Sequence, residues 1–192
     1  MSTTTISKSA SKVYQEHLGQ LGYGIALWTP KPLDGKPAVR IGDVGYIDPD
    51  HGSWHGLFNI LDPRESQKDV PDNFSPLTTS SLSSKPIRYP NQLQAQIYTS
   101  QEITQKDLPA DKSSRNEHPD TVTCQYRCEG ESGALLALQQ GCDSVLVPHN
   151  RDWISYMRRN HRSWHDYVTQ KCGLTIDKED VILVRDHIKA RN

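Results

Sequence analysis

Residues 150–172 read NRDWISYMRRNHRSWHDYVTQKC, and this stretch decides the fold of the chain. If it winds as a helix at about 100° per residue, five large side chains fall within one arc roughly 100° wide. They are Trp153, Met157, Trp164, Tyr167 and Val168. Asn150 is suited to the N-cap, and Gly173 is a typical residue after a helix end. The pattern predicts a long helix over 150–172 that packs on the core through this aromatic stripe.

The composition describes a polar chain of nearly balanced charge. It has 192 residues, of which 34% are hydrophobic, and 22 basic residues stand against 23 acidic ones. This length suits a single domain over residues 1–192. A net charge of -1 argues against a protein devoted to bulk nucleic acid, so nucleic acid is not the favoured partner.

The sequence also indicates a compartment. The N-terminal residues contain no apolar run of the signal-peptide kind, and no segment approaches the ~18 apolar residues of a membrane span. We therefore expect a soluble, cytoplasmic protein with no membrane partner. The four cysteines are then expected to be reduced thiols, because their spacing is unlike that of secreted disulfide scaffolds. They are Cys124, Cys128, Cys142 and Cys172.

The N-terminal third is expected to form a short helix and then strands. Residues 1–22 read as a polar tail with a helix over 11–18. Aromatic and β-branched residues then predict an antiparallel meander. Its expected strands are residues 23–28, 39–47 and 54–60. Gly42 and Gly45 lie within the second of them, where glycine usually marks a bulge or a close approach of another backbone or a ligand.

Residues 62–120 are predicted to be a long, loop-rich insertion. They contain seven of the twelve prolines and nine serines. Only residues 94–99 show a convincing strand pattern there. A long ordered loop is more often functional than decorative, because its ordering entropy must be offset by contacts.

The C-terminal third reads as strands around the long helix. Residues 121–128 alternate like a strand, and short apolar runs occupy 133–138, 144–147 and 181–184. A right-handed crossover would place the last run in the same sheet. The ending RDHIKARN reads as a charged tail. The predicted fold is α+β, with a mixed, largely antiparallel sheet packed by one long C-terminal helix.

Two histidines of the predicted helix have metal-ligand spacing. His161 and His165 lie four residues apart, as zinc ligands on helices do. No Glu follows His161, and this residue falls inside the apolar arc, so packed core histidines are the better interpretation. Cys124 and Cys128 would lie about 13 Å apart on one strand face, too far to bind one ion. We expect no metal and no cofactor, with the two histidines as a weak alternative.

The opposite face of the same helix carries a basic stripe. Arg151, Arg158 and Arg162 fall within roughly 40° of one another. Such a stripe can bind phosphate, but it is more often a solvated helix face. These arginines remain candidate ligand-binding residues.

The segment 48–55 (DPDHGSWH) is a second candidate site. A carboxylate beside an imidazole fixes its tautomer and raises its basicity, which is the minimum for acid–base chemistry. Asp43, His51 and His55 are the catalytic candidates, and Trp54 is a candidate ligand-binding residue. The same residues are also ordinary hairpin-turn chemistry. The sequence contains no G-x-S-x-G elbow, P-loop or G-x-G-x-x-G motif.

Several phrases of the chain resemble one protein family. GYGIALWTPKP, VRIGDVGYID and WHGLFNILDP near the start, with GALLAL, RDWISYM, SWHDYV and EDVILV later, are similar to an uncharacterised family from mushroom-forming fungi. The resemblance covers about half of the chain and misses the middle. It implies no activity, cofactor or catalytic residue, and it implies further sequence after the final strand.

The sequence favours a non-catalytic recognition or signalling module that binds a protein or a small ligand. Aromatic and glycine-rich strands with a long loop supply binding surface, whereas specific catalytic motifs are missing from the sequence. A hydrolase or nuclease with a His/Asp pair is one alternative, so enzyme activity is left open. A self-associating structural protein, bound to copies of itself, is the other.

Overall fold

The computed structural model describes residues 8–32, 35–78, 85–107, 124–148 and 151–191. The chain divides into two compact units. Unit 1 comprises Met1–Ala26 and Gln96–Leu138, and unit 2 comprises Leu27–Ala95 and Gln139–Asn192. The expectation of a single domain over residues 1–192 stays a prediction.

Unit 1 contains one helix and two small antiparallel sheets. Helix α1 spans Ala10–Gly19, and the Ser9 side chain caps it by accepting from the backbone N–H of Lys12. The strands pair as β4 with β7 and β5 with β6. Their bounds are Ile97–Thr99 (β4), Ile103–Asp107 (β5), Cys124–Cys128 (β6) and Leu135–Ala137 (β7). The helix predicted over residues 11–18 is confirmed.

Unit 2 is built on two three-stranded sheets and one long helix. The first sheet has the order β2-β1-β9, and the second has the order β10-β8-β3. The strands are β1 (Asp43–Ile47), β2 (Trp54–Asn59), β3 (Ile87–Leu93), β8 (Cys142–Leu146), β9 (Ile182–Leu183) and β10 (Asp186–Ala190). The short 3-10 helices η1 (Arg64–Ser66) and η3 (Lys178–Asp180) lie in the connections.

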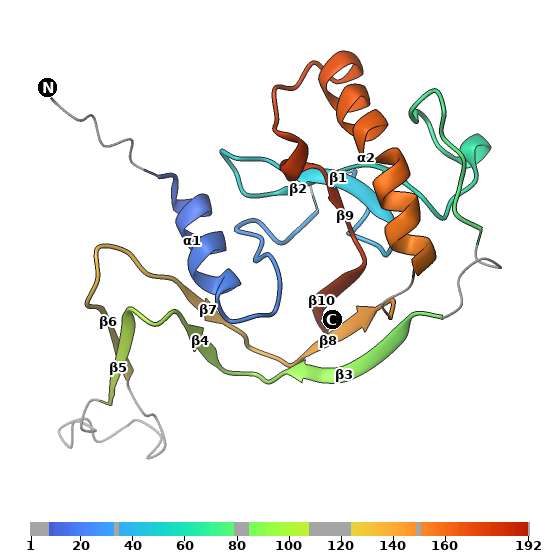
Figure 1. Cartoon of the computed structure of the whole chain (residues 1–192). Coiled ribbons are helices and arrows are strands. Elements are labelled where there is room, and N and C mark those ends of the chain that lie inside the picture. The colour runs from blue at the N-terminus through green and yellow to red at the C-terminus, as the bar shows by residue number, and fades with distance from the viewer. Residues whose placement is uncertain (1–7, 33–34, 79–84, 108–123, 149–150, 192) are drawn as a thin grey trace, which may run out of the picture. The chain divides into compact units, whose positions relative to one another are not determined.

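The long helix α2 covers the first sheet of unit 2 and closes its core (Figure 1). It spans Arg151–Lys171, and Gly173 follows it in a left-handed conformation with φ of 67°. Trp164 is only 1% exposed and packs edge-on against Phe58 of β2. The long helix and its apolar stripe are therefore confirmed, while Asn150 lies outside the described residues.

The predicted apolar stripe is wrong at one residue. Met157 remains 36% exposed, and Tyr156 is buried in its neighbourhood instead. The Tyr156 hydroxyl donates a 2.6 Å hydrogen bond to the carbonyl of Ser75. Helical periodicity predicts the direction of a side chain, but not whether another segment covers that turn of the helix.

The α+β class is confirmed, and three local expectations are wrong. The named strands all pair antiparallel, so residues 181–184 join β1 rather than a parallel crossover partner. Residues 23–28 form no strand, because Gly22 and Gly24, at the start of this segment, have positive φ values of 78° and 100°. The charged ending forms β10 rather than a tail. The loop-rich insertion over 62–120 also contains the strands β3 and β5.

The glycines of the first sheet have the role that the sequence indicates. The register of β1 against β2 shifts between Val44 and Gly45, which is a bulge. A Cβ added to Gly45 would lie 2.1 Å from the carbonyl oxygen of His55, and one added to Gly42 would lie 2.7 Å from Asn59 Oδ1. Only glycine fits this close approach of the two strands.

Two further findings concern the environment of the chain. Within the described residues, no helix is long and apolar enough to cross a membrane. The four cysteines, all of which lie in described segments, form no disulfide with one another.

Candidate functional site

The second sheet of unit 2 carries a row of basic side chains on one face. Alternate residues of a strand point to the same face, so His187, Lys189 and Arg191 of the β10 segment share one side. In the register of the sheet, Lys189 lies opposite Asp143 of β8, and His187 lies opposite Val145. On the other side of β8, Arg88 of β3 also pairs with Val145.

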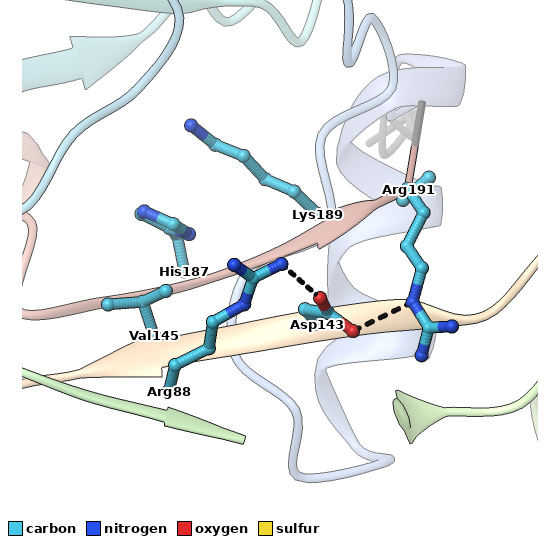
Figure 2. Close-up of a pocket in the computed structure, with 7 residues that line it drawn as sticks. Arg88, Asp143, Val145, His187, Lys189 and Arg191 are labelled. Carbon is cyan, nitrogen blue, oxygen red and sulfur yellow. Dashed lines mark hydrogen bonds and ion pairs between the residues drawn. The ribbon is translucent and has the colours of Figure 1, made fainter. Parts of the chain in front are cut away.

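These side chains line a hollow of about 430 Å³, here called the basic hollow (Figure 2). Its lining residues are Arg88, Asp143, Val145, His187, Lys189, Ala190 and Arg191. The volume is in the range of small-molecule sites. Three basic side chains, those of Arg88, Lys189 and Arg191, face one carboxylate, so the hollow carries a net charge of about +2 when all three are charged and His187 is neutral.

Asp143 joins the two arginines at the floor of the basic hollow (Figure 2). Arg88 Nη2 donates to Asp143 Oδ2 at 2.5 Å, and Arg191 Nε donates to Oδ1 at 3.0 Å. The backbone N–H of Asn91 adds a third donor to Oδ1 at 3.1 Å. Arg88, then the Asn91 amide and Arg191, hold the pKa of Asp143 far below its ordinary range. The carboxylate is therefore ionised and fixes the direction of both guanidinium groups.

The guanidinium groups keep hydrogen-bonding capacity for a ligand. Each has five N–H groups. Arg88 gives one to Asp143, and Arg191 gives one to Asp143 and one to the side chain of Asn91. Side-chain exposures of 71% for Arg88 and 42% for Arg191 leave the remaining N–H groups accessible.

Of the other two polar residues of the basic hollow, His187 is half-buried and Lys189 is exposed. Burial and the nearby Lys189 lower the pKa of His187, so its imidazole is neutral at pH 7. Its Nδ1 is buried and has no hydrogen-bond partner among the described residues. Burial also lowers the pKa of Lys189, whose ammonium donates to the carbonyl of Val39.

The predicted catalytic residues lie elsewhere in unit 2 and do not form one group. Asp43 is buried at the start of β1 and accepts from Asn59 Nδ2 and from the backbone N–H of Arg40, both at 2.7 Å. Burial raises the pKa of Asp43 despite these bonds. His55 pairs with Tyr46, about 10 Å further along the strand. Asp43 is thus a structural carboxylate at the other end of the hairpin.

A different carboxylate, Asp48, contacts both predicted histidines. Its Oδ1 lies 3.0 Å from His51 Nδ1, and its Oδ2 lies 3.8 Å from His55 Nε2. The backbone N–H groups of His51 and Asp50 also donate to Oδ1, and His51 is the main cause of the lowered pKa of Asp48. The His51 side chain is 76% exposed at the tip of the turn. The cluster has the bonding of an Asx turn that closes the hairpin.

The predicted binding and metal residues are also spread out. Trp54 is half-buried, and its indole covers Gly45 and Gly56. Arg151, Arg158 and Arg162 are all exposed on α2, away from the basic hollow.

The two helix histidines have packing roles. His161 meets the edge of the Trp164 ring, and His165 Nε2 donates to the carbonyl of Ile176 at 2.9 Å. In the part of the chain that the structure describes, no group of three or more His, Cys, Asp or Glu side chains could hold a metal ion.

Sequence reasoning missed the basic hollow, although one signal was present. In the ending RDHIKARN, basic residues alternate with Ile188 and Ala190, which is the period of a strand with one polar face. Arg88 and Asp143 carry no such local signal, because only the pairing of three distant segments brings them together.

The comparisons add no relative to this picture. No family model matches the chain, and neither the curated proteins nor the solved structures contain a match to it. The resemblance to the fungal family stays a prediction from the sequence.

Proposed function

We propose that unit 2 of this protein is a non-catalytic recognition module whose basic hollow binds a small ligand through a dianionic phosphate group. The observation that supports this proposal is the convergence of three cations on one concave sheet face. A module of this kind holds its ligand on a rigid scaffold, and β8 is hydrogen-bonded on both edges. A cytoplasmic location and membership of the fungal family belong to the same proposal.

Charge favours phosphate over a simple carboxylate as the bound group. The net charge of about +2 matches a phosphate monoester dianion, whereas a monocarboxylate would neutralise only half of it. Arginine also presents planar N–H groups that match phosphate oxygens. Asp143 supports this role because it orients Arg88 and Arg191 without neutralising both.

The lining of the hollow favours ligand binding over acid–base catalysis, because the catalytic residues predicted from the sequence are not part of it. Asp43, His51 and His55 do not line it. His187, the only histidine in the lining, lies opposite Val145, and its Nδ1 has no hydrogen-bond partner among the described residues.

Calorimetric titration with glycerol 3-phosphate, inorganic phosphate and acetate tests the proposal. We expect saturable binding of both phosphates and much weaker binding of acetate. Lys189→Gln and Arg191→Gln should each weaken binding at least tenfold, because a charge-assisted hydrogen bond contributes about 1.5–3 kcal/mol.

Arg185→Gln is the matched control. Arg185 lies on the same segment and pairs with Asp186 on the surface, but it does not line the basic hollow. Its replacement should leave the affinity within about twofold. Equal affinities for all four proteins, or no saturable binding to the wild type, would contradict the proposal.

A further inference from the structure

Unit 1 contains a serine, a histidine and a carboxylate linked in one chain of hydrogen bonds. His17 Nε2 lies 3.0 Å from Ser132 Oγ, and His17 Nδ1 lies 2.9 Å from Glu102 Oε2. Glu102 lies 85 positions after His17 in the sequence, and Ser132 lies 115 positions after it. These distances are in the range that links nucleophile, base and orienting carboxylate in serine hydrolases.

The partners of His17 determine its tautomer. A carboxylate only accepts hydrogen bonds, so the proton of the neutral imidazole resides on Nδ1 and is donated to Glu102. Nε2 is then the acceptor for the Ser132 hydroxyl. The backbone N–H of Glu102 and the Ser100 hydroxyl, together with His17, lower the pKa of Glu102, so its carboxylate is ionised at neutral pH. This is the protonation state in which the imidazole can take the proton of the serine.

The surrounding loops hold the three groups in place. Ser100 is 2% exposed, and its backbone and hydroxyl bond to the backbone of Ala134 at 2.9 and 3.1 Å. This pairing ties the turn that carries Glu102 to the loop that carries Ser132. Gly133 follows the serine, and a Cβ there would lie 2.8 Å from Ile103 Cδ1, so the loop packs tightly against β5.

The burial of the three groups suits a reaction at the serine end. The side chain of His17 is 15% exposed and that of Glu102 is 31% exposed. Ser132 as a whole residue is half-buried, so part of its surface is accessible to solvent. His17, bonded through both ring nitrogens, is less exposed than Glu102.

We propose that Ser132 and His17 are the nucleophile and general base of an acyl-transfer site, with Glu102 as positioning residue, that hydrolyses small esters. Ser132 Oγ bonds to the ester carbonyl carbon while its proton passes to His17 Nε2. The bond from that carbon to the leaving alkoxide breaks, and the alkoxide takes the proton from His17. Water then bonds to the acyl carbon while His17 Nε2 takes its proton. The bond from that carbon to Ser132 Oγ breaks, the acid leaves, and His17 returns the proton to the serine oxygen. This site is distinct from the basic hollow and stands independently of the phosphate-binding proposal.

A fluorophosphonate probe tests the assignment directly. The serine oxygen bonds to phosphorus and fluoride leaves, so intact-mass and peptide mass spectrometry should locate one adduct on Ser132 of the wild-type protein. Ser132→Ala should lose the adduct, whereas the control Ser155→Ala, at an exposed position of α2, should retain it. No adduct on folded wild-type protein, or an undiminished adduct on Ser132→Ala, would overturn the proposal.

The base and its carboxylate have their own readouts. His17→Ala should slow labelling at least 100-fold, and added imidazole should restore part of the rate, which a purely structural role would not allow. Glu102→Gln should shift the midpoint of the pH profile of labelling to lower pH, because the carboxylate stabilises the protonated imidazole. Unchanged rates in His17→Ala, or an unchanged profile in Glu102→Gln, would remove these roles.

Discussion

Trp164 of α2 holds the core of unit 2 together, and its truncation should be severe. Its side chain is 1% exposed and lies between the rings of Phe58 and Tyr156, each with a centroid 6.0 Å away. Trp164→Ala removes the indole from a place where the sheet and the helix meet. Neighbours on two different elements cannot both move in to fill the space, so a cavity remains.

The expected cost follows from the size of this cavity. Replacement of a buried Trp or Phe by Ala lowers the free energy of unfolding by about 3–5 kcal/mol, and Trp164 belongs at the upper end because its aromatic contacts add to the lost burial. Domains of this size are stable by about 5–15 kcal/mol. The variant should therefore fold, but with little stability left.

Urea unfolding followed by far-UV circular dichroism measures this change. Trp28→Ala is the matched control, because Trp28 is 50% exposed and its loss should cost less than about 1 kcal/mol. A loss below about 1 kcal/mol for Trp164→Ala, or equal losses for the two variants, would refute the assignment of Trp164 to the core.

Two more predictions concern the hairpin and the basic hollow. Gly45→Ala should lower the free energy of unfolding by more than about 2 kcal/mol, because its Cβ would collide with the His55 carbonyl. Gly19→Ala, whose Cβ would meet only a distant atom 3.9 Å away, should be close to neutral in the same urea assay. The pKa of His187 is lower in the folded state than in the unfolded state. The neutral imidazole therefore contributes its full share to the free energy of unfolding above about pH 6.5, and this share is lost as the pH falls through the pKa of the folded state. His187→Gln should therefore flatten the decline of the urea midpoint between pH 7 and 5, and an unchanged slope would contradict this.

The sequence predicts those elements whose pattern is local. The period of Trp153, Trp164 and Val168 marks the long helix because these residues lie on one face of consecutive turns. Gly45 marks the bulge because a Cβ has no room there. The same reasoning fails for residues 23–28, where an aromatic run resembles a strand but positive φ values at the glycines turn the backbone away.

The polar strand β10 shows why the second sheet was missed. Its charged residues suggest a solvated tail, and only Ile188 and Ala190 on the other face give it a strand period. An edge strand with one solvent-exposed face needs few apolar residues, because pairing with β8 satisfies the hydrogen bonds of its backbone. Hydrophobicity is therefore a weak guide to such a strand.

The candidate sites depend on long-range pairing, which no local pattern encodes. Arg88 and Asp143 meet because β3 and β8 pair across 55 residues of sequence. His17, Glu102 and Ser132 lie on a helix and two loops, in stretches that contain no catalytic motif. Asp48 is the exception, since it lies inside the segment 48–55 that the sequence indicates, although the carboxylate among the predicted catalytic residues is Asp43.

The most direct test of the proposed function is to map phosphate binding onto the chain by NMR. In ¹⁵N–¹H correlation spectra of the wild-type protein titrated with glycerol 3-phosphate, we expect saturable shifts of the amides of β8 and β10 and of Asn91. Lys189→Gln should abolish most of these shifts. Shifts confined to the exposed arginines of α2, or shifts that never saturate, would contradict the account.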